Sequence, residues 1–277
     1  MPIQVGFTLG VMDKKESVKD DIEGGNVQKD SKMLSYLEKA LNTLIAIQHP
    51  GAIREFFTSR AFSVPCHQLN SAVKRYQPYF ATILDVGANI GQFALAATLY
   101  FPDAKIYSFE PVPDVFKVLQ ENINKNPKIE AFNCALGNQH GQILFHRNEY
   151  TRLSSALQID ENNDNIRYNE RKFSVINVDI FRLDEFYKNM DIQPPVLLKI
   201  DVQGMETDVL LGCKHFLDQV DFILCEVPLV RLYNNQPMFD EMHHFTSQLG
   251  YKFVAPLYLN RGKGGRVIEM DVLYQKK

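Results

Sequence analysis

Four residues that can shape a ligand site, Asp85, Gly87, Asn89 and Gly91, stand close together in the stretch DVGANIG. Glycine lets the backbone turn tightly and approach a ligand closely. A strand-like run precedes this stretch and a helix-like run follows it, so the free N–H groups of a helix N-terminus would face the same ligand. Turns of this kind hold nicotinamide dinucleotides, flavins, nucleotide phosphates and S-adenosylmethionine, which imply different chemistries.

The residue types in this turn distinguish among those ligands. The dinucleotide fingerprint is G-x-G-x-x-G, whereas this chain lacks the middle glycine and carries Asp85 shortly before Gly87. A carboxylate there would repel a pyrophosphate and would suit a cationic ligand group. S-adenosylmethionine carries a sulfonium and an ammonium but no phosphate, so the turn favours this methyl donor over NAD.

A second carboxylate, Glu110, ends the next strand-like run, 19 residues after Gly91. At the end of a second parallel strand, a carboxylate can accept hydrogen bonds from both ribose hydroxyls of a nucleoside cofactor. Glu110 by itself could equally be a surface acid that follows a strand. Its combination with the glycine turn favours the ribose contact.

Strand-like and helix-like patterns alternate from residue 80 onward, which predicts a mainly parallel sheet covered by helices. Two strand-like runs at the C-terminal end are joined by only NRGKGG, which leaves no room for a helix and predicts an antiparallel hairpin. Runs at 142–149 and 172–181 read as extra strands, and a short helix is expected at 183–189. The main strands are expected at 81–88, 104–111, 128–136, 195–203 and 220–228, and the helices at 92–100, 115–124, 206–217 and 239–249.

The N-terminal part has a different pattern. Alternating apolar residues from Ile3 to Leu9 predict a strand, and leucines at helical spacing after Ser31 predict a helix that ends at Pro50. A second helical stretch is expected at about 53–76, interrupted near Pro65. We therefore expect an N-terminal strand and helical cap at residues 1–79 and a cofactor-binding domain at residues 80–277, with an insertion at about 138–180.

Six stretches occur in order over about residues 80–275: DVGANIG, SFEP, NCALG, the Ser154-Ser155 pair, KIDVQGME and a late EV…LY run. Together they resemble the FkbM family of S-adenosylmethionine-dependent methyltransferases, whose known members are largely O-methyltransferases of sugar or natural-product hydroxyls. The resemblance implies an α/β, Rossmann-like class I methyltransferase fold, in which a seven-stranded, mostly parallel sheet has an antiparallel final strand. It also implies O-methylation of a hydroxyl on a small molecule, natural product or glycan.

The family resemblance also implies places for the parts of the cofactor. The glycine turn would hold its amino-acid end, Glu110 its ribose, and the end of the third strand its adenine. Asp201, after the fourth strand, would lie next to the transferred methyl group. The cofactor-binding residues expected in this way are Asp85, Gly87, Ala88, Asn89, Gly91, Glu110, Pro111, Ala135, Leu136, Ser155 and Asp201.

A hydroxyl is a weak nucleophile, so its methylation benefits from a general base. Asp201 or Glu206 could take the proton, although Asp201 could instead bind the ammonium of the methyl donor and Glu206 could merely cap a helix. His146 and His67 are rival bases. A divalent metal held by Asp179, Asp201 and Glu226 is an alternative means of activation, but no dedicated ligand spacing supports it and we expect no metal site.

The tip of the C-terminal hairpin is rich in cations. If the first hairpin strand runs parallel to the sheet, this tip lies at the carboxyl edge, where it could receive an anionic acceptor group; a solvated turn is the alternative. Residues of the insertion and of the segment after the fifth strand could line the same mouth. The acceptor-binding residues expected are Arg231, Tyr233, Arg261, Lys263 and Arg266, with His146, Arg147 and Arg152 nearby.

The composition excludes several classes of protein. The chain has 277 residues, of which 45% are hydrophobic and 23% charged, and its formal net charge of −3 argues against nucleic-acid and membrane partners. No apolar run approaches the roughly 18 residues of a membrane span. Four scattered cysteines and the absence of a signal-peptide pattern indicate a cytoplasmic protein. A homodimer through the N-terminal strand and helix is a further expectation.

Three alternative functions stay open at this point. A small amine could replace the hydroxyl as methyl acceptor. The domain could bind its cofactor without catalysis. An NAD-dependent oxidoreductase of Rossmann type is the third alternative.

Overall fold

The computed structural model describes residue 44 and residues 49–148, 154–157, 173–262 and 265–277. One compact unit begins at Ala46 and extends to the C-terminus. The expected strand at residues 3–9, the helix from Ser31 and the proposed dimer contact lie outside the described residues. In the part of the chain that is described, no helix has the length and apolar character that a membrane span requires.

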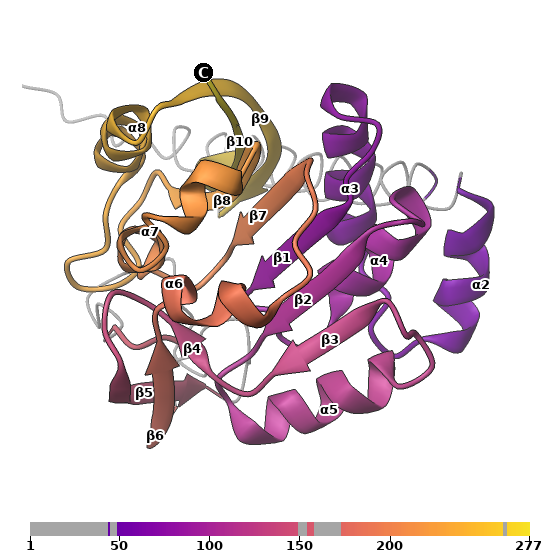
Figure 1. Ribbon diagram of the computed structural model, residues 1–277, viewed down its shortest axis with the longest axis horizontal. Helices are drawn as coiled ribbons and strands as arrows, with labels where there is room; N and C mark the ends of the chain where they lie inside the picture. Colours follow the sequence, from indigo (N-terminus) through magenta and orange to yellow (C-terminus); the bar gives the residue numbers. More distant parts are fainter. Residues whose placement is uncertain (1–43, 45–48, 149–153, 158–172, 263–264) are drawn as a thin grey trace, which may run out of the picture. The chain divides into compact units, whose positions relative to one another are not determined.

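The main sheet has seven strands in the order β3-β2-β1-β7-β8-β10-β9 (Figure 1). Pairing is parallel from β3 to β8, and β10 runs antiparallel to both β8 and β9. This arrangement confirms the expected class I methyltransferase fold. The strands are β1 (Thr82–Val86), β2 (Lys105–Phe109), β3 (Ile129–Phe132), β7 (Val196–Ile200), β8 (Phe222–Pro228), β9 (Tyr251–Arg261) and β10 (Val267–Lys276).

Helices cover both faces of the main sheet. Residues Ile83 and Leu197 belong to the core layer under α3, α4 and α5, whereas Leu84 and Leu198 belong to the layer under α6, α7 and α8 (Figure 1). The central strands β1 and β7 are therefore apolar on both faces, as buried parallel strands are. The helices are α2 (Pro50–Thr58), α3 (Val64–Tyr76), α4 (Gln92–Tyr100), α5 (Pro113–Ile123), α6 (Leu183–Phe186), α7 (Glu206–Leu211) and α8 (Phe239–Gln248), with 3-10 turns η3 (Tyr187–Asn189) and η4 (Phe216–Gln219).

The boundary of the compact unit differs from the expectation at residue 80. Ser63 caps the N-terminus of α3, and Leu69 and Val73 of this helix are buried in the same core layer as Phe93 of α4. A break at residues 59–63 separates α2 from α3, close to the expected interruption. Helix α3 is therefore part of the same compact unit as the main sheet rather than a separate cap.

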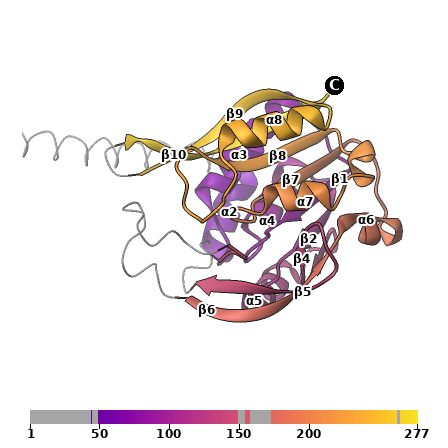
Figure 2. The same ribbon diagram turned by 90° about the vertical axis from the view of Figure 1, so that its left-hand side faces the viewer.

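The insertion forms a second, small sheet in the order β4-β6-β5, which Figure 2 shows beside α5. Its strands are β4 (Ala135–Leu136), β5 (Gly141–Asn148) and β6 (Phe173–Phe181), and Phe145 and Val178 pack on Val115 of α5. The single strand expected at 128–136 is thus wrong. The continuous strand-like pattern hides a change of sheet, because β3 ends at Phe132 and β4 begins at Ala135.

The turn after β1 permits only glycine at position 87. Gly87 has φ +77°, and a Cβ atom there would lie 1.8 Å from the backbone oxygen of Asp201. Asp201 N donates to Val86 O at 3.0 Å, so this contact joins the ends of β1 and β7. The close approach of the two strand ends depends on the missing side chain.

We expect Gly87→Ala to lower the free energy of unfolding in urea by at least about 3 kcal/mol, which combines the left-handed backbone cost with overpacking. Gly250→Ala is the matched control, because Gly250 has φ +90° and open space around its Cβ position. It should cost about 1 to 2 kcal/mol, since only the backbone term applies. Equal losses in the two variants would contradict the steric account.

Candidate active site

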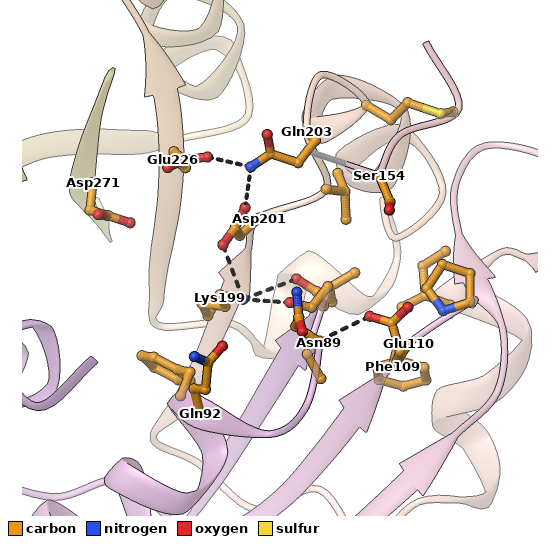
Figure 3. A pocket seen from close by; sticks show the side chains of 18 of the residues that line it. Asn89, Gln92, Phe109, Glu110, Ser154, Lys199, Asp201, Gln203, Glu226 and Asp271 are labelled. Atoms are coloured by element: carbon orange, nitrogen blue, oxygen red, sulfur yellow. Dashed lines mark hydrogen bonds and ion pairs between the residues drawn. The ribbon is translucent and has the colours of Figure 1, made fainter. Parts of the chain in front are cut away.

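A cavity of about 510 Å³ lies beyond the carboxyl ends of the central strands, where open α/β sheets bind ligands (Figure 3). The turn after β1 forms its floor, and Glu110 after β2 lines one end. Asp201 after β7 and Glu226 of β8 line the other end. The C-terminal hairpin contributes further polar side chains, among them Asn260 and Asp271.

Asp85 and Lys199 form a buried ion pair beneath this floor. They are direct register partners on β1 and β7, and Lys199 Nζ lies 2.9 Å from Asp85 Oδ1 and 3.7 Å from Asp201 Oδ2. Lys199 also donates to Gly87 O at 2.9 Å and lies over the ring of Phe93. Burial alone would lower the pKa of Lys199, but the carboxylates of Asp85 and Asp201 raise it, so the ammonium stays charged.

Glu110 links the turn after β1 to the end of β2. Its Oε2 accepts from Asn89 N and its Oε1 from Val112 N, both at 2.9 Å. The side chain is 6% exposed, and burial raises its pKa to about 7 against the opposing effect of these hydrogen bonds. The carboxylate is therefore held in a fixed position at the cavity wall.

Carboxyl groups crowd the opposite end of the cavity. Asp271 on β10 is the register partner of Glu226 on β8, and Glu269 lies two residues from Asp271. Burial raises the pKa of Asp271 to about 7 and raises that of Glu226 well above its usual range, and Asp201 adds to both effects. Gln203 Nε2 donates to Asp201 Oδ1 at 2.8 Å and to Glu226 Oε2 at 2.7 Å. This end of the cavity can both accept and donate hydrogen bonds, because some of its carboxyl groups are protonated near neutral pH.

Most of the expected cofactor residues line the cavity, and three do not. Asp85 is wholly buried in the ion pair, so its carboxylate cannot contact a ligand directly as we expected. Gly91 instead begins α4 with φ +90°, close to Leu119. Ser155 Oγ donates to Gln203 O at 2.6 Å, and its neighbour Ser154 lines the cavity instead. The expected residues that line it are Gly87, Ala88, Asn89, Glu110, Pro111, Ala135, Leu136 and Asp201.

Among the candidate bases, only Asp201 lines the cavity. Glu206 is 2% exposed, and its Oε1 accepts from Gly204 N at 3.0 Å and from Val202 N at 3.3 Å, so it braces the loop before α7. His146 lies on β5, and its backbone pairs with that of Ser155 in an isolated antiparallel bridge. His67 is fully buried beside Glu55. Glu206, His146 and His67 are therefore not placed to contact an acceptor.

The expected acceptor residues lie away from the cavity. The first hairpin strand does run parallel to the sheet, but Arg261 and Arg266 are exposed at the tip and do not line the cavity. Arg231 is also exposed, and Tyr233 is buried behind Gln203. Lys263 and Arg152 lie outside the described residues.

The described residues contain no group of three His, Cys, Asp or Glu side chains arranged to hold a metal ion. Asp179 lies on β6, where it accepts from Gln142 at 3.0 Å, and does not join Asp201 and Glu226. Lys199, Gln203, Glu269 and Asp271 line the cavity but were not expected there. The charged residues within the apolar strands VLLKI and VIEMDVLY are a signal that could have identified three of them.

The chain is similar in sequence to known methyltransferases. The family model of the methyltransferase FkbM domain matches residues 85–253. The 2-O-methyltransferase NoeI of Sinorhizobium fredii is 29% identical over 211 residues, which are 73% of this chain and 84% of that protein. The hexuronic acid methyltransferase AglP of Haloferax volcanii is 28% identical over 144 residues, which are 52% of this chain and 54% of that protein. The chain therefore spans about half the length of the second relative.

Among solved structures, the magnesium protoporphyrin IX methyltransferase of Synechocystis aligns with 77% of this chain and 81% of its own, at 9% identity and a TM-score of 0.43. This similarity is too low to inform the chemistry of the cavity.

We expect Asp85→Leu alone to lower the free energy of unfolding by about 3 to 5 kcal/mol, because it leaves the Lys199 ammonium buried without its main partner. The double variant Asp85→Leu/Lys199→Met should be more stable than the single variant, since no buried charge remains. Urea unfolding of the two proteins measures this difference. A double variant less stable than the single one would show that Lys199 is not held by Asp85.

Glu206 should make stability depend on pH. Burial raises its pKa to about 7, so between about pH 4.5 and 7 the folded state keeps a proton that the unfolded state releases. Stability should therefore fall as the pH rises through this window, by about 1.4 kcal/mol per pH unit for one such group. Glu206→Gln should flatten this slope in urea unfolding, whereas Glu121→Gln on the exposed surface of α5 should leave it unchanged.

Proposed function

The chain belongs to the FkbM family of S-adenosylmethionine-dependent methyltransferases, and on this premise we propose that it methylates a hydroxyl of a small molecule, natural product or glycan. The observation that carries the proposal is Asp201, which lies at the end of β7 with its carboxylate in the cavity. A hydroxyl acceptor is also indicated by the name of one relative, a 2-O-methyltransferase.

The residues around the turn fit the proposed methyl donor. Glu110 holds a carboxylate where ribose hydroxyls can donate to it, and Leu136, Ile143 and Phe145 form an apolar wall suited to an adenine. Gly87, Ala88 and Asn89 line the floor of the cavity. Glu110 and Asp201 flank this floor, so a pyrophosphate would meet two carboxylates there. These features support a cofactor without phosphate.

When bound, S-adenosylmethionine supplies an electrophilic methyl group. Asp201 would accept the hydroxyl proton while the acceptor oxygen forms the new C–O bond and the S–C bond breaks. Gln203 donates to Oδ1 of Asp201, and Oδ2, which lies 3.7 Å from Lys199 Nζ, would receive that proton. Asp201 is 37% exposed at its side chain, so the proton can pass from it to solvent.

The charge of the cavity bears on the acceptor. Four carboxyl groups line its acceptor end, those of Asp201, Glu226, Glu269 and Asp271. Lys199 is the one cationic side chain among the described residues that line the cavity, and it already pairs with Asp85. An uncharged polyhydroxyl acceptor therefore fits better than the anionic one expected from the hairpin tip. The same carboxyl groups would attract an amine, so N-methylation of a small amine is the second candidate.

Cys134, Cys213 and Cys225 are buried thiols. We infer from them that the protein works in a reducing compartment such as the cytoplasm.

The function is tested by a methyl-transfer screen with S-adenosylmethionine labelled in its methyl group. The acceptors are neutral glycans, uronic acids, hydroxylated metabolites and small amines, each with and without magnesium. Labelled methyl ethers, formed without a magnesium requirement, are expected. Transfer only to amines would overturn the hydroxyl assignment.

Asp201→Asn should mainly lower kcat, whereas Glu110→Ala should mainly weaken the binding of the cofactor. We expect Asp201→Asn to reduce kcat about 10²- to 10⁴-fold, the range of general-base catalysis, with little change in the affinity for S-adenosylhomocysteine. Glu110→Ala should weaken that affinity about tenfold or more, because it removes charge-assisted hydrogen bonds to the ribose. Steady-state kinetics and calorimetry distinguish the two variants. An unchanged affinity in Glu110→Ala would refute the ribose assignment.

A further inference from the structure

Gln203 has an unusual backbone for its residue type. Its φ of 56° is in the left-handed region, which glycine adopts readily and a residue with a long side chain rarely does. Such strain persists where the surrounding structure requires it, and it concentrates at functional sites. Gln203 lies in the loop between β7 and α7, next to Asp201, and its side chain lines the cavity.

The side-chain amide of Gln203 joins two carboxyl groups from neighbouring strands (Figure 3). Its Nε2 donates to Oδ1 of Asp201 at 2.8 Å and to Oε2 of Glu226 at 2.7 Å. An amide nitrogen carries two hydrogens, so each carboxyl group receives one. A neutral double donor thereby joins the two carboxyl groups without adding a charge.

Tyr233 determines which way this amide points. Its hydroxyl donates to Gln203 Oε1 at 3.0 Å, and its side chain is fully buried. Burial and then the nearby carboxylates raise the pKa of Tyr233 well above its usual range, so the phenol remains a donor. With the carbonyl oxygen engaged in this way, both N–H bonds of the amide are directed at the carboxyl groups.

The main chain of Gln203 is held as well. Its carbonyl oxygen accepts from Ser155 Oγ at 2.6 Å, and a Cβ atom at the following residue, Gly204, would lie 2.6 Å from Leu157 Cδ1. The pair of serines from the insertion thus connects the small sheet to the cavity. Ser155 therefore holds the main chain of Gln203, whereas Tyr233 orients its amide.

We propose that Gln203 is a positioning residue for methyl transfer, which holds one oxygen of Asp201 and one of Glu226 and so fixes the orientation of both carboxyl groups in the cavity. The inference rests on the proposed function. In this arrangement Asp201 receives the proton of the reacting hydroxyl, and Glu226 binds a neighbouring hydroxyl of the acceptor. Gln203 itself does not contact the reacting atoms, and it acts through the two carboxyl groups.

Gln203→Glu tests this role most sharply, because it keeps the shape and replaces the double donor with a third carboxyl group. We expect kcat at pH 8 to fall at least tenfold and to recover in part as the pH is lowered, since the introduced carboxyl group can donate again once it is protonated. The affinity for S-adenosylhomocysteine, measured by calorimetry, should change less than threefold. An unchanged kcat and pH profile would overturn the proposal.

Three further variants separate positioning from stability. Gln203→Asn keeps an amide and tolerates the left-handed backbone, but it is one methylene too short to reach both carboxyl groups, so kcat should fall as in Gln203→Glu without the recovery at low pH. Tyr233→Phe should give a smaller loss of kcat, because the amide is no longer oriented. Gln219→Glu, the same substitution on an exposed turn, should match the wild type.

A second measurement needs neither cofactor nor acceptor. Between pH 5 and 8, the melting temperature of Gln203→Glu should drop increasingly below that of the wild type, because a carboxyl group among carboxyl groups has a raised pKa when folded and its stability is lost as the pH rises. A difference independent of pH would show that the amide does not hold the two groups. If the wild type methylates no acceptor, the proposed function fails, whereas this thermal comparison still decides whether Gln203 holds the carboxyl groups.

Discussion

The ion pair between Asp85 and Lys199 is the interaction on which the site depends. The two residues face each other across the central strands, each two positions after a residue of the apolar core, Ile83 on β1 and Leu197 on β7. Removing either charge would leave the other buried and unpaired, which is costly. The Lys199 ammonium also donates to the carbonyl oxygen of Gly87. The same charged group therefore pairs β7 with β1 and holds the turn after β1. The packing of β1 on β7 and the shape of the cavity floor therefore have a common cause.

The same strand pair divides the cavity into two chemically different ends. Glu110 accepts from the backbone at one end, and the carboxyl groups near Asp201 and Glu226 are held by an amide at the other. The first end offers a fixed acceptor with apolar walls, as a nucleoside requires. The second offers donors and acceptors close together, as a polyhydroxyl compound requires.

Much of this fold could be predicted from periodicity, and the site only in part. The central strands, α4 and the parallel course of β9 follow from patterns that are local in the sequence. The partner of Asp85 does not, because it depends on the register between β1 and β7, two strands more than 100 residues apart. For this reason Asp85 was expected to contact the ligand, whereas it contacts Lys199. For Glu206 the sequence left a base and a helix cap open, and only the folded loop shows that its carboxyl group accepts from backbone N–H groups.

The central claim is that this cavity binds a nucleoside cofactor without phosphate. Isothermal titration calorimetry of the full chain with S-adenosylhomocysteine and, separately, with NAD tests it most directly. The account predicts saturable binding of S-adenosylhomocysteine at one site per chain and no binding of NAD at the same concentrations. Saturable binding of NAD without binding of S-adenosylhomocysteine would contradict it.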